Sequence, residues 1–313
     1  MKYSAVIAAE GISSRMYEFK PMLCLGENTM IAAVVRNLRE AGVGEIVVVT
    51  GYKSELMSKH LSTLDVRICE NERYAETKMY DSLCLGLQAL QDPYDYVFLT
   101  PGDVPLVQPR TIRKMQESQC SMMRPVCGKK PGHPVMLSRE LVPSLYSYNG
   151  KNGLRGAMES FADPILEIEV DDEGVLVDVD TPADLKALYR KGMLLRNGGQ
   201  LWPDIQIQIA KENAILTPEI AQYLEMIGHT GSIQNACACM HMSYTRGWKL
   251  LNQIEKELGY PLVERYPGGT SGGGSALTVK GKRLLTAYQT YREKLQDTAK
   301  NLFSEVFSKE LIN

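Results

Sequence analysis

Short apolar runs alternate with amphipathic segments from Tyr3 to about Arg196, and no other feature of the sequence constrains the fold as strongly. The runs predict strands at residues 6–9, 46–50, 66–69 and 96–100, and helical patterns begin near residues 29, 54 and 79. Alternation of this kind is typical of βαβ units. We therefore predict an α/β fold for residues 1–196, a Rossmann-like, mostly parallel sheet covered on both faces. Ligands of such sheets bind beyond the carboxyl ends of the strands.

A Gly/Ser-rich loop follows the first predicted strand, with the sequence Ala-Ala-Glu-Gly-Ile-Ser-Ser-Arg-Met-Tyr-Glu-Phe-Lys at residues 8–20. In such a turn the backbone N–H groups can bind phosphate oxygens. Arg15 and Lys20 add two positive charges to the same loop. The loop therefore predicts an anionic, phosphate-bearing ligand. The alternative is a Gly/Ser loop that holds two cations by chance.

Two carboxylates occupy similar places at the ends of predicted strands. Asp103 follows the strand at residues 96–100 in the sequence Thr-Pro-Gly-Asp-Val-Pro, and Asp180 lies in Val-Asp-Val-Asp-Thr-Pro. Mg²⁺ bound with a nucleotide takes one or two carboxylates together with phosphate oxygens. The alternative for each acid is a helix cap, for Asp103 at the helix that begins near Pro109.

These motifs resemble those of the MobA-like nucleotidyltransferases of the molybdenum cofactor cytidylyltransferase type. The likeness extends to the Gly-His-Pro-Val sequence at residues 132–135 and, more weakly, to residues 71–87. It implies transfer of NMP from an NTP, CTP favoured and GTP possible, to a molybdopterin-type acceptor. By this resemblance the nucleotide is bound by Ala9, Gly11, Ser13, Ser14, Arg15, Lys20 and Ser82; catalysis depends on Arg15, Lys20 and Asp103; Asp103 and Asp180 hold Mg²⁺; and Lys129, Lys130 and His133 bind the acceptor.

Some of these positions leave alternatives open or depart from the family pattern. Asp81 or Ser82 could simply cap the helix that starts near residue 79. Glu10 stands where the family has Ala or Gly, and Tyr17 where it usually has Gly. Because the backbone approaches the nucleotide at residue 10, an additional carboxylate there is expected to repel phosphate.

Composition sets broad limits on the whole chain. It has 313 residues, a net charge of −2, 44% hydrophobic and 23% charged residues, which is typical of a two-domain globular protein. No apolar run is long enough for a membrane span, so we expect a cytoplasmic protein without a membrane partner. The seven scattered cysteines indicate a reducing compartment. Cys237 and Cys239 are predicted to be small buried thiols in a helix, because their spacing with His241 matches no common zinc site.

The polar sequence Asn-Gly-Gly-Gln at residues 197–200 marks a boundary, after which we place a second domain at residues 200–313. Residues 203–216 alternate as in a half-exposed strand. Helices then start at Thr217, at Ser232 and at Ser243, and the last two form a helix-turn-helix pattern. Residues 243–283 include seven cationic residues and only three acidic ones, a local excess of positive charge. Residues suited to DNA contacts are Ser243, Tyr244, Thr245, Arg246 and Lys249, with Arg265 beyond the helix.

A Gly-rich segment at residues 268–275 lies between two strand-like runs, as in the wing of a winged helix-turn-helix domain. From residue 205 to about residue 291 the sequence resembles the N-terminal DNA-binding domain of the molybdate-responsive transcriptional regulator. Gly247 replaces the Ala that this family usually has before Trp248. After Thr278 an amphipathic pattern continues to about Phe307, and its apolar stripe predicts a long dimerisation helix and a homodimer.

The combined prediction is a nucleotidyltransferase domain fused to a DNA-binding regulator domain. Two alternatives stay open from the residues alone. One is a catalytically weak, nucleotide- or cofactor-sensing transcription factor. The other is a transferase that acts on a sugar phosphate or phosphocholine.

Overall fold

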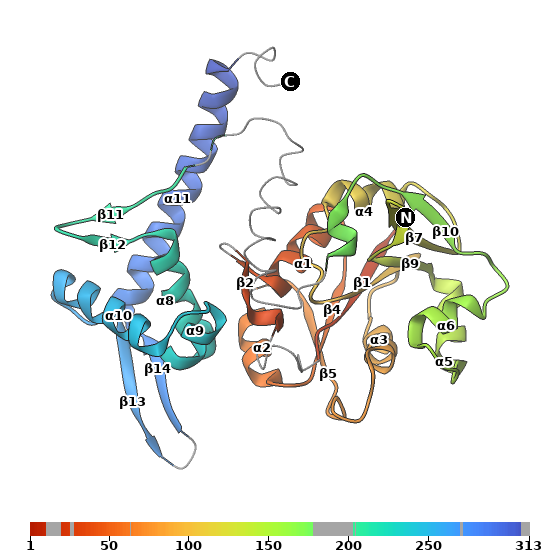
Figure 1. The fold of residues 1–313 in the computed structure, drawn as a ribbon, viewed down its shortest axis with the longest axis horizontal. Helices are drawn as coiled ribbons and strands as arrows, with labels where there is room; N and C mark the ends of the chain where they lie inside the picture. Colours follow the sequence, from red (N-terminus) through yellow and green to blue (C-terminus); the bar gives the residue numbers. More distant parts are fainter. Residues whose placement is uncertain are drawn as a thin grey trace. The chain divides into compact units, whose positions relative to one another are not determined.

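A computed structural model describes residues 1–10, 20–25, 28–62, 64–177, 203, 205–269 and 272–307. The chain divides into two compact units, Met1–Arg196 and Asn197–Asn313, and each is described by itself (Figure 1). Within the described residues no helix is both long enough and apolar enough to cross a membrane.

The first unit is built on a sheet whose strands follow the order β10-β7-β9-β6-β1-β4-β5, with β8 paired to β7. Parallel pairs join β1 to β4 and β6, β4 to β5, and β7 to β10, whereas β9 runs antiparallel to β6 and β7. This arrangement confirms the predicted mostly parallel sheet. The strands are β1 Tyr3–Ala8, β4 Ile46–Thr50, β5 Arg67–Glu70, β6 Tyr96–Pro101, β7 Met122–Cys127, β8 Lys130–Pro131, β9 Val135–Ser138 and β10 Leu166–Glu169; a separate hairpin pairs β2 Cys24–Leu25 with β3 Asn28–Thr29.

Helices cover both faces of this sheet, as Figure 1 shows. On one face, alternate residues of β1, β4 and β6 form a core with α3, α5 and α6. Gly86 of α3 permits close packing there, because a Cβ at this position would lie 2.3 Å from Val6 Cγ1. The helices of this unit are α1 Met30–Glu40, α2 Ser54–Leu61, α3 Met79–Gln88, α4 Pro109–Gln116, α5 Val142–Ser147 and α6 Gly153–Glu159; the 3-10 turns are η1 Lys20–Met22, η2 Arg139–Leu141 and η3 Glu173–Leu176.

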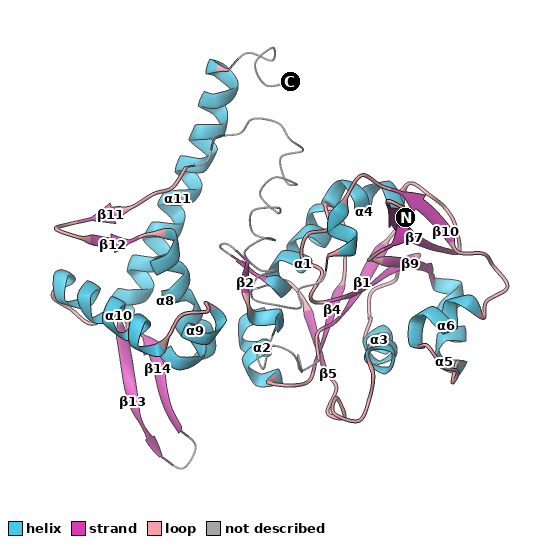
Figure 2. Cartoon of the chain, viewed as in Figure 1, coloured by secondary structure: helices cyan, strands magenta, loops and turns pink. Residues whose placement is uncertain are grey.

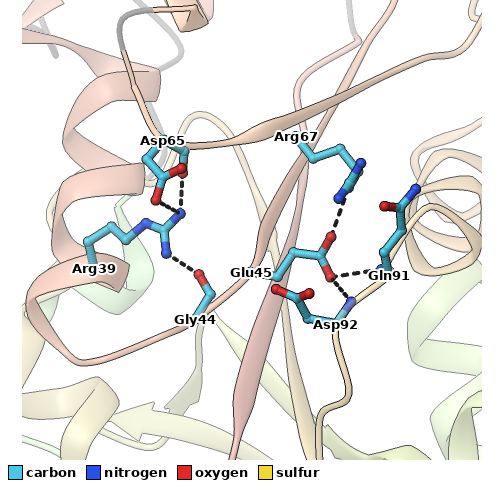
Figure 3. A network of polar contacts seen from close by, with 7 residues as sticks. All are labelled: Arg39, Gly44, Glu45, Asp65, Arg67, Gln91 and Asp92. Atoms are coloured by element: carbon cyan, nitrogen blue, oxygen red, sulfur yellow. Dashed lines mark hydrogen bonds and ion pairs between the residues drawn. The ribbon is translucent and has the colours of Figure 1, made fainter.

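A network of polar contacts lies at the end of the sheet where β4 and β5 begin (Figure 3). Glu45 Oε1 accepts a hydrogen bond of 2.8 Å from Arg67 Nε, and Oε2 accepts the N–H groups of Gln91 and Asp92 at 2.8 Å. Burial raises the pKa of Glu45, but these hydrogen bonds and the Arg67 charge outweigh burial, so the pKa is lowered. The network joins three chain segments at the edge opposite the carboxyl ends of β4 and β5.

In the part of the second unit that the structure describes, four helices accompany two hairpins (Figure 2). As predicted, α8, α9, α10 and α11 begin after Thr217, Ser232, Ser243 and Thr278, whose side chains each accept a hydrogen bond from a backbone N–H of the first turn. The elements are β11 Ile209–Ala210, β12 Ala214–Leu216, α8 Pro218–Thr230, α9 Ile233–Cys239, α10 Tyr244–Leu258, β13 Val263–Gly269, β14 Gly272–Leu277 and α11 Val279–Val306.

The single half-exposed strand predicted for residues 203–216 is wrong. The chain there forms the β11–β12 hairpin, whose turn includes a hydrogen bond of 3.0 Å from Lys211 N to Asn213 O. Of the three alternating isoleucines before the turn only Ile207 is buried, and Ile205 and Ile209 are exposed. The alternation of isoleucines therefore occurs in a segment of which only a short part pairs with another strand.

The cysteines of α9 lie where the sequence placed them. Cys237 and Cys239 are buried inside the second unit, and Cys237 Sγ lies 3.6 Å from the hydroxyl of Tyr223 on α8. Gly247 of α10 packs against this pair. A Cβ at Gly247 would lie 2.4 Å from Cys237 Sγ and 2.6 Å from Tyr223 Oη, which accounts for glycine at this position.

Candidate functional site

The first site lies at the carboxyl ends of β1 and β6. Gly102 N donates to Ala8 O at 2.8 Å, and the missing side chain of Gly102 lets the turn after β6 approach Ala9. The turn therefore presents Asp103 beside the end of β1. The helix cap considered for Asp103 is wrong, because the N-cap residue of α4 is Gln108, whose N–H donates to the buried Asp172 at 2.9 Å.

Lys20 and Asp103 come together in this site. Lys20 Nζ lies 3.8 Å from Asp103 Oδ2, and their side chains are 13% and 29% exposed. An apolar cluster positions both partners: Leu23 follows Lys20 in the chain, Leu106 follows Asp103, and the two leucines pack together with Met30. The pair places a cation and a carboxylate at the edge where ligands of parallel sheets bind.

Glu10 also lies in this site, but its side chain is turned into the protein and is only 7% exposed. Burial raises the pKa of Glu10, and the nearby Asp103 charge raises it further. Hydrogen bonds from its own backbone and from Ser82 oppose this rise without cancelling it. The negative charge predicted at residue 10 is therefore both buried and disfavoured.

Ser82 is fully buried in α3 and accepts a hydrogen bond of 2.9 Å from Asn71 Nδ2. The N-cap residue of this helix is Lys78, and Asp81 forms the capping box with it, because Asp81 Oδ2 accepts the Lys78 N–H at 2.8 Å. The capping alternative therefore holds for Asp81 and not for Ser82. Sequence reasoning missed Asn71 as an individual residue. The available signal was its position directly after β5, at the same edge as Asp103.

The three residues assigned to the acceptor lie along the same edge of the sheet. Lys129 and Lys130 are exposed after the carboxyl end of β7, and His133 precedes the antiparallel strand β9. His133 N donates to Val175 O at 2.9 Å. Strand direction thus brings these residues to the edge that carries Asp103. The remaining predicted site residues lie outside the described residues: Gly11, Ser13, Ser14, Arg15 and Asp180.

A second candidate surface lies on α10 in the second unit. Ser243 caps the helix, and the side chains of Tyr244, Thr245 and Lys249 are exposed. The exposed Arg246 is paired with an acid of α8, since its Nη2 lies 2.7 Å from Glu219 Oε1.

The helix-turn-helix of α9 and α10 is followed by the β13–β14 hairpin, the order of elements in a winged helix-turn-helix domain. Arg265 of β13 contacts two residues of α10, since it lies over the ring of Trp248 and beside Glu255.

Comparisons with known proteins divide along the chain in the same way. Residues 5–165 match the family model described as the MobA-like NTP transferase domain. The molybdenum cofactor cytidylyltransferase of Escherichia coli (strain K12) is 26% identical over 181 residues, which cover 57% of this chain and 91% of that protein. A nucleotidyl transferase from Methanothermobacter thermautotroptrophicus superposes with a TM-score of 0.55 at 25% identity, over 61% of this chain and 98% of that one.

A different kind of relative matches a shorter stretch. The DNA-binding transcriptional dual regulator ModE of Escherichia coli (strain K12) is 32% identical over 88 residues, which are 28% of this chain and 33% of the regulator. This chain therefore spans about a third of that regulator's length.

Proposed function

We propose that this chain, which belongs to the family of MobA-like NTP transferase domains, is a nucleotidyltransferase that acts on molybdenum cofactor and also binds DNA through its second unit. Nucleotidyl transfer is the activity of the family. The acceptor, the choice of CTP over GTP, and the DNA-binding role are our proposals.

The pair of Lys20 and Asp103 is the observation that supports the transfer site best. A fixed cation and a carboxylate 3.8 Å apart, at the carboxyl ends of β1 and β6, suit a nucleotide with its metal. In the proposed reaction an oxygen of the acceptor's terminal phosphate attacks the α-phosphorus of the NTP. The bond from the α-phosphorus to the bridging oxygen breaks, and pyrophosphate leaves.

The protein's part in this reaction is to position the substrates and stabilise charge. Lys20 and Arg15 are proposed to stabilise the growing negative charge on the phosphates, and the backbone amides of Gly11 and Ser13 are proposed to bind phosphate oxygens. The strand-end carboxylate of Asp103, partly exposed and made of hard oxygen donors, fits Mg²⁺, with Asp180 as its second ligand. When bound, Mg²⁺ would neutralise charge on the triphosphate.

Specificity for the nucleotide and for the acceptor is proposed to come from two groups of residues at the edge of the sheet that carries Asp103. Ala9, directly after β1, and Ser82, which bonds Asn71, are proposed to contribute to nucleotide binding, and CTP is favoured over GTP by the resemblance to a cytidylyltransferase. Lys129, Lys130 and His133 are proposed to receive the anionic acceptor, because two lysines at an exposed turn suit phosphate.

The test is pyrophosphate release with each of the four NTPs, with and without molybdenum cofactor. Release that requires both CTP and the cofactor supports the proposal. Release with a sugar phosphate or phosphocholine in place of the cofactor identifies a different acceptor. No release with any pair, together with nucleotide binding, identifies a sensing domain.

A specific observation also supports DNA binding by the second unit. The helix α10 starts with Ser243, Tyr244, Thr245, Arg246 and Lys249 exposed, and the β13–β14 hairpin follows in the position of a wing. The 28-residue α11 carries exposed apolar side chains, among them Tyr291, Leu302 and Val306, and we propose that the same helix of a second chain covers them. Footprinting of the upstream DNA and sedimentation of the protein test these two points.

A further inference from the structure

The wing is defined here as the β13–β14 hairpin, which follows α10 in the chain (Figure 2). The side chain of Arg265, on β13, contacts residues of α10. Its guanidinium carbon is 4.1 Å from the centroid of the Trp248 ring. The same indole stacks with Tyr244, at 6.0 Å between centroids and an interplanar angle of 27°. A contact this close between a guanidinium and an indole is a cation–π interaction, and it connects the first strand of the wing with α10.

Two polar residues of α10 hold the same strand. Glu255 Oε1 accepts the N–H groups of Leu262 at 2.7 Å and Val263 at 3.0 Å, and Oε2 lies 3.3 Å from Arg265 Nη2. Asn252 Oδ1 accepts from the same guanidinium at 3.3 Å. We refer to Arg265, Trp248, Asn252 and Glu255 as the wing clasp.

The charges of the clasp argue against a direct role for Arg265 at a phosphate. Its side chain is 37% exposed, and Glu255, at 13% exposed, provides a neighbouring negative charge. No lysine or arginine occurs between Tyr266 and Val279, so the rest of the wing brings no cationic side chain to DNA. Contacts from this wing depend on backbone and hydroxyl groups, and such contacts require the wing to be held at the correct distance from α10.

We infer that Arg265 is a positioning residue, which fixes the wing against α10 through Trp248 and Glu255 instead of binding a phosphate itself. The inference rests on the proposed DNA-binding function. It replaces the expectation, drawn from the sequence, that Arg265 contacts DNA directly. Arginine suits this role better than lysine, because its planar group stacks on an indole and donates to two acceptors at once.

The first experiment measures the clasp without DNA. In a Trp202→Phe background Trp248 is the only tryptophan, so acrylamide quenching of fluorescence reports its exposure. We expect Arg265→Lys and Arg265→Ala to increase quenching alike, while the exposed Arg283→Lys on α11 leaves it unchanged. Quenching of Arg265→Lys equal to that of the parent would overturn the inference, because a positive charge alone would then suffice. Thermal unfolding of each variant verifies that the unit is folded.

The second experiment measures affinity for a mixed-sequence DNA duplex over a range of salt concentrations. If Arg265 is a positioning residue, both variants should bind DNA about tenfold more weakly, while the dependence of log affinity on log salt concentration keeps the slope of the parent. A phosphate ligand predicts instead a slope reduced by about one in Arg265→Ala and retained in Arg265→Lys. That second pattern overturns the inference. If the parent protein binds no DNA, the proposed function fails, and the quenching result alone decides whether Arg265 holds the clasp.

Discussion

Replacement of Gly247 by alanine tests the packing between the first turns of α10 and the core of the second unit. A Cβ built at this position lies 2.4 Å from Cys237 Sγ and 2.6 Å from Tyr223 Oη. Both distances are far below van der Waals contact, and both atoms belong to buried side chains. We expect Gly247→Ala to destabilise the unit, although alanine is the better helix former.

The magnitude follows from two opposing terms. Overpacking of a well-packed core costs about 1–3 kcal/mol. Two simultaneous contacts on short, buried side chains belong in the upper half of that range. Replacing glycine by alanine inside a helix contributes about 1 kcal/mol in the opposite direction. The free energy of unfolding should therefore fall by about 1–2 kcal/mol.

Urea unfolding followed by Trp248 fluorescence in the Trp202→Phe background measures the second unit alone. The matched variants remove the atoms that the new methyl group meets. Tyr223→Phe removes the hydroxyl and Cys237→Ala removes the sulfur, so each should reduce the cost of Gly247→Ala, and the coupling free energy should be favourable. A Gly247→Ala protein as stable as its parent, or additive effects in the double variants, would refute this description of the core.

Three further changes have defined outcomes. Asp103→Asn should lower the rate of pyrophosphate release by about 10²–10³ with an unchanged circular dichroism spectrum, and near-normal turnover would remove this carboxylate from the reaction. Glu45→Gln should cost about 1–2 kcal/mol of unfolding free energy at pH 7. Since the pKa of Glu45 is lowered in the folded state, by Arg67 among others, that stability is present above the ordinary glutamate pKa and is lost as pH falls through the folded value. Urea unfolding should therefore give different free energies of unfolding for parent and variant at pH 7, and similar ones in acid. A difference that is the same at both pH values would contradict this explanation. Glu219→Gln should free Arg246 from its exposed ion pair and strengthen DNA binding about two- to fivefold in mobility-shift assays, whereas weaker binding would show that the pair orients Arg246 productively.

The sequence was most informative where one physical pattern decides the outcome. The run of five β-branched residues at Ile46–Thr50 favours a strand, and the structure shows it buried throughout. The hydroxyl residues Thr217 and Ser243 indicate helix starts because their side chains accept first-turn N–H groups. Alternation failed at Ile205 to Ile209, because a period of two does not report whether a neighbouring strand exists.

Contacts between distant segments were beyond a reading of local sequence. Neither the pairing of Asn71 with Ser82 nor the position of Arg265 on Trp248 has a local signature, because each depends on how two elements approach in space. The buried Asp172 is a third example. It lies beyond β10 in the chain, yet it accepts hydrogen bonds from Gln108 N and Thr111 Oγ1 at the start of α4.

Glu10 shows how the structure changes the meaning of a departure from a family pattern. Taken alone, a carboxylate in place of Ala or Gly argues against phosphate binding and for a domain that only senses its ligand. In the folded chain Gly51 leaves room for this side chain, since a Cβ at Gly51 would lie 2.9 Å from Glu10 Cβ. Glu10 is thereby buried beside Ser82. Burial raises the pKa of Glu10, because it disfavours the charged carboxylate. The fold thus turns the Glu10 carboxylate into the protein, which weakens the argument for the sensing alternative, and it brings Lys20 and Asp103 together in the same site.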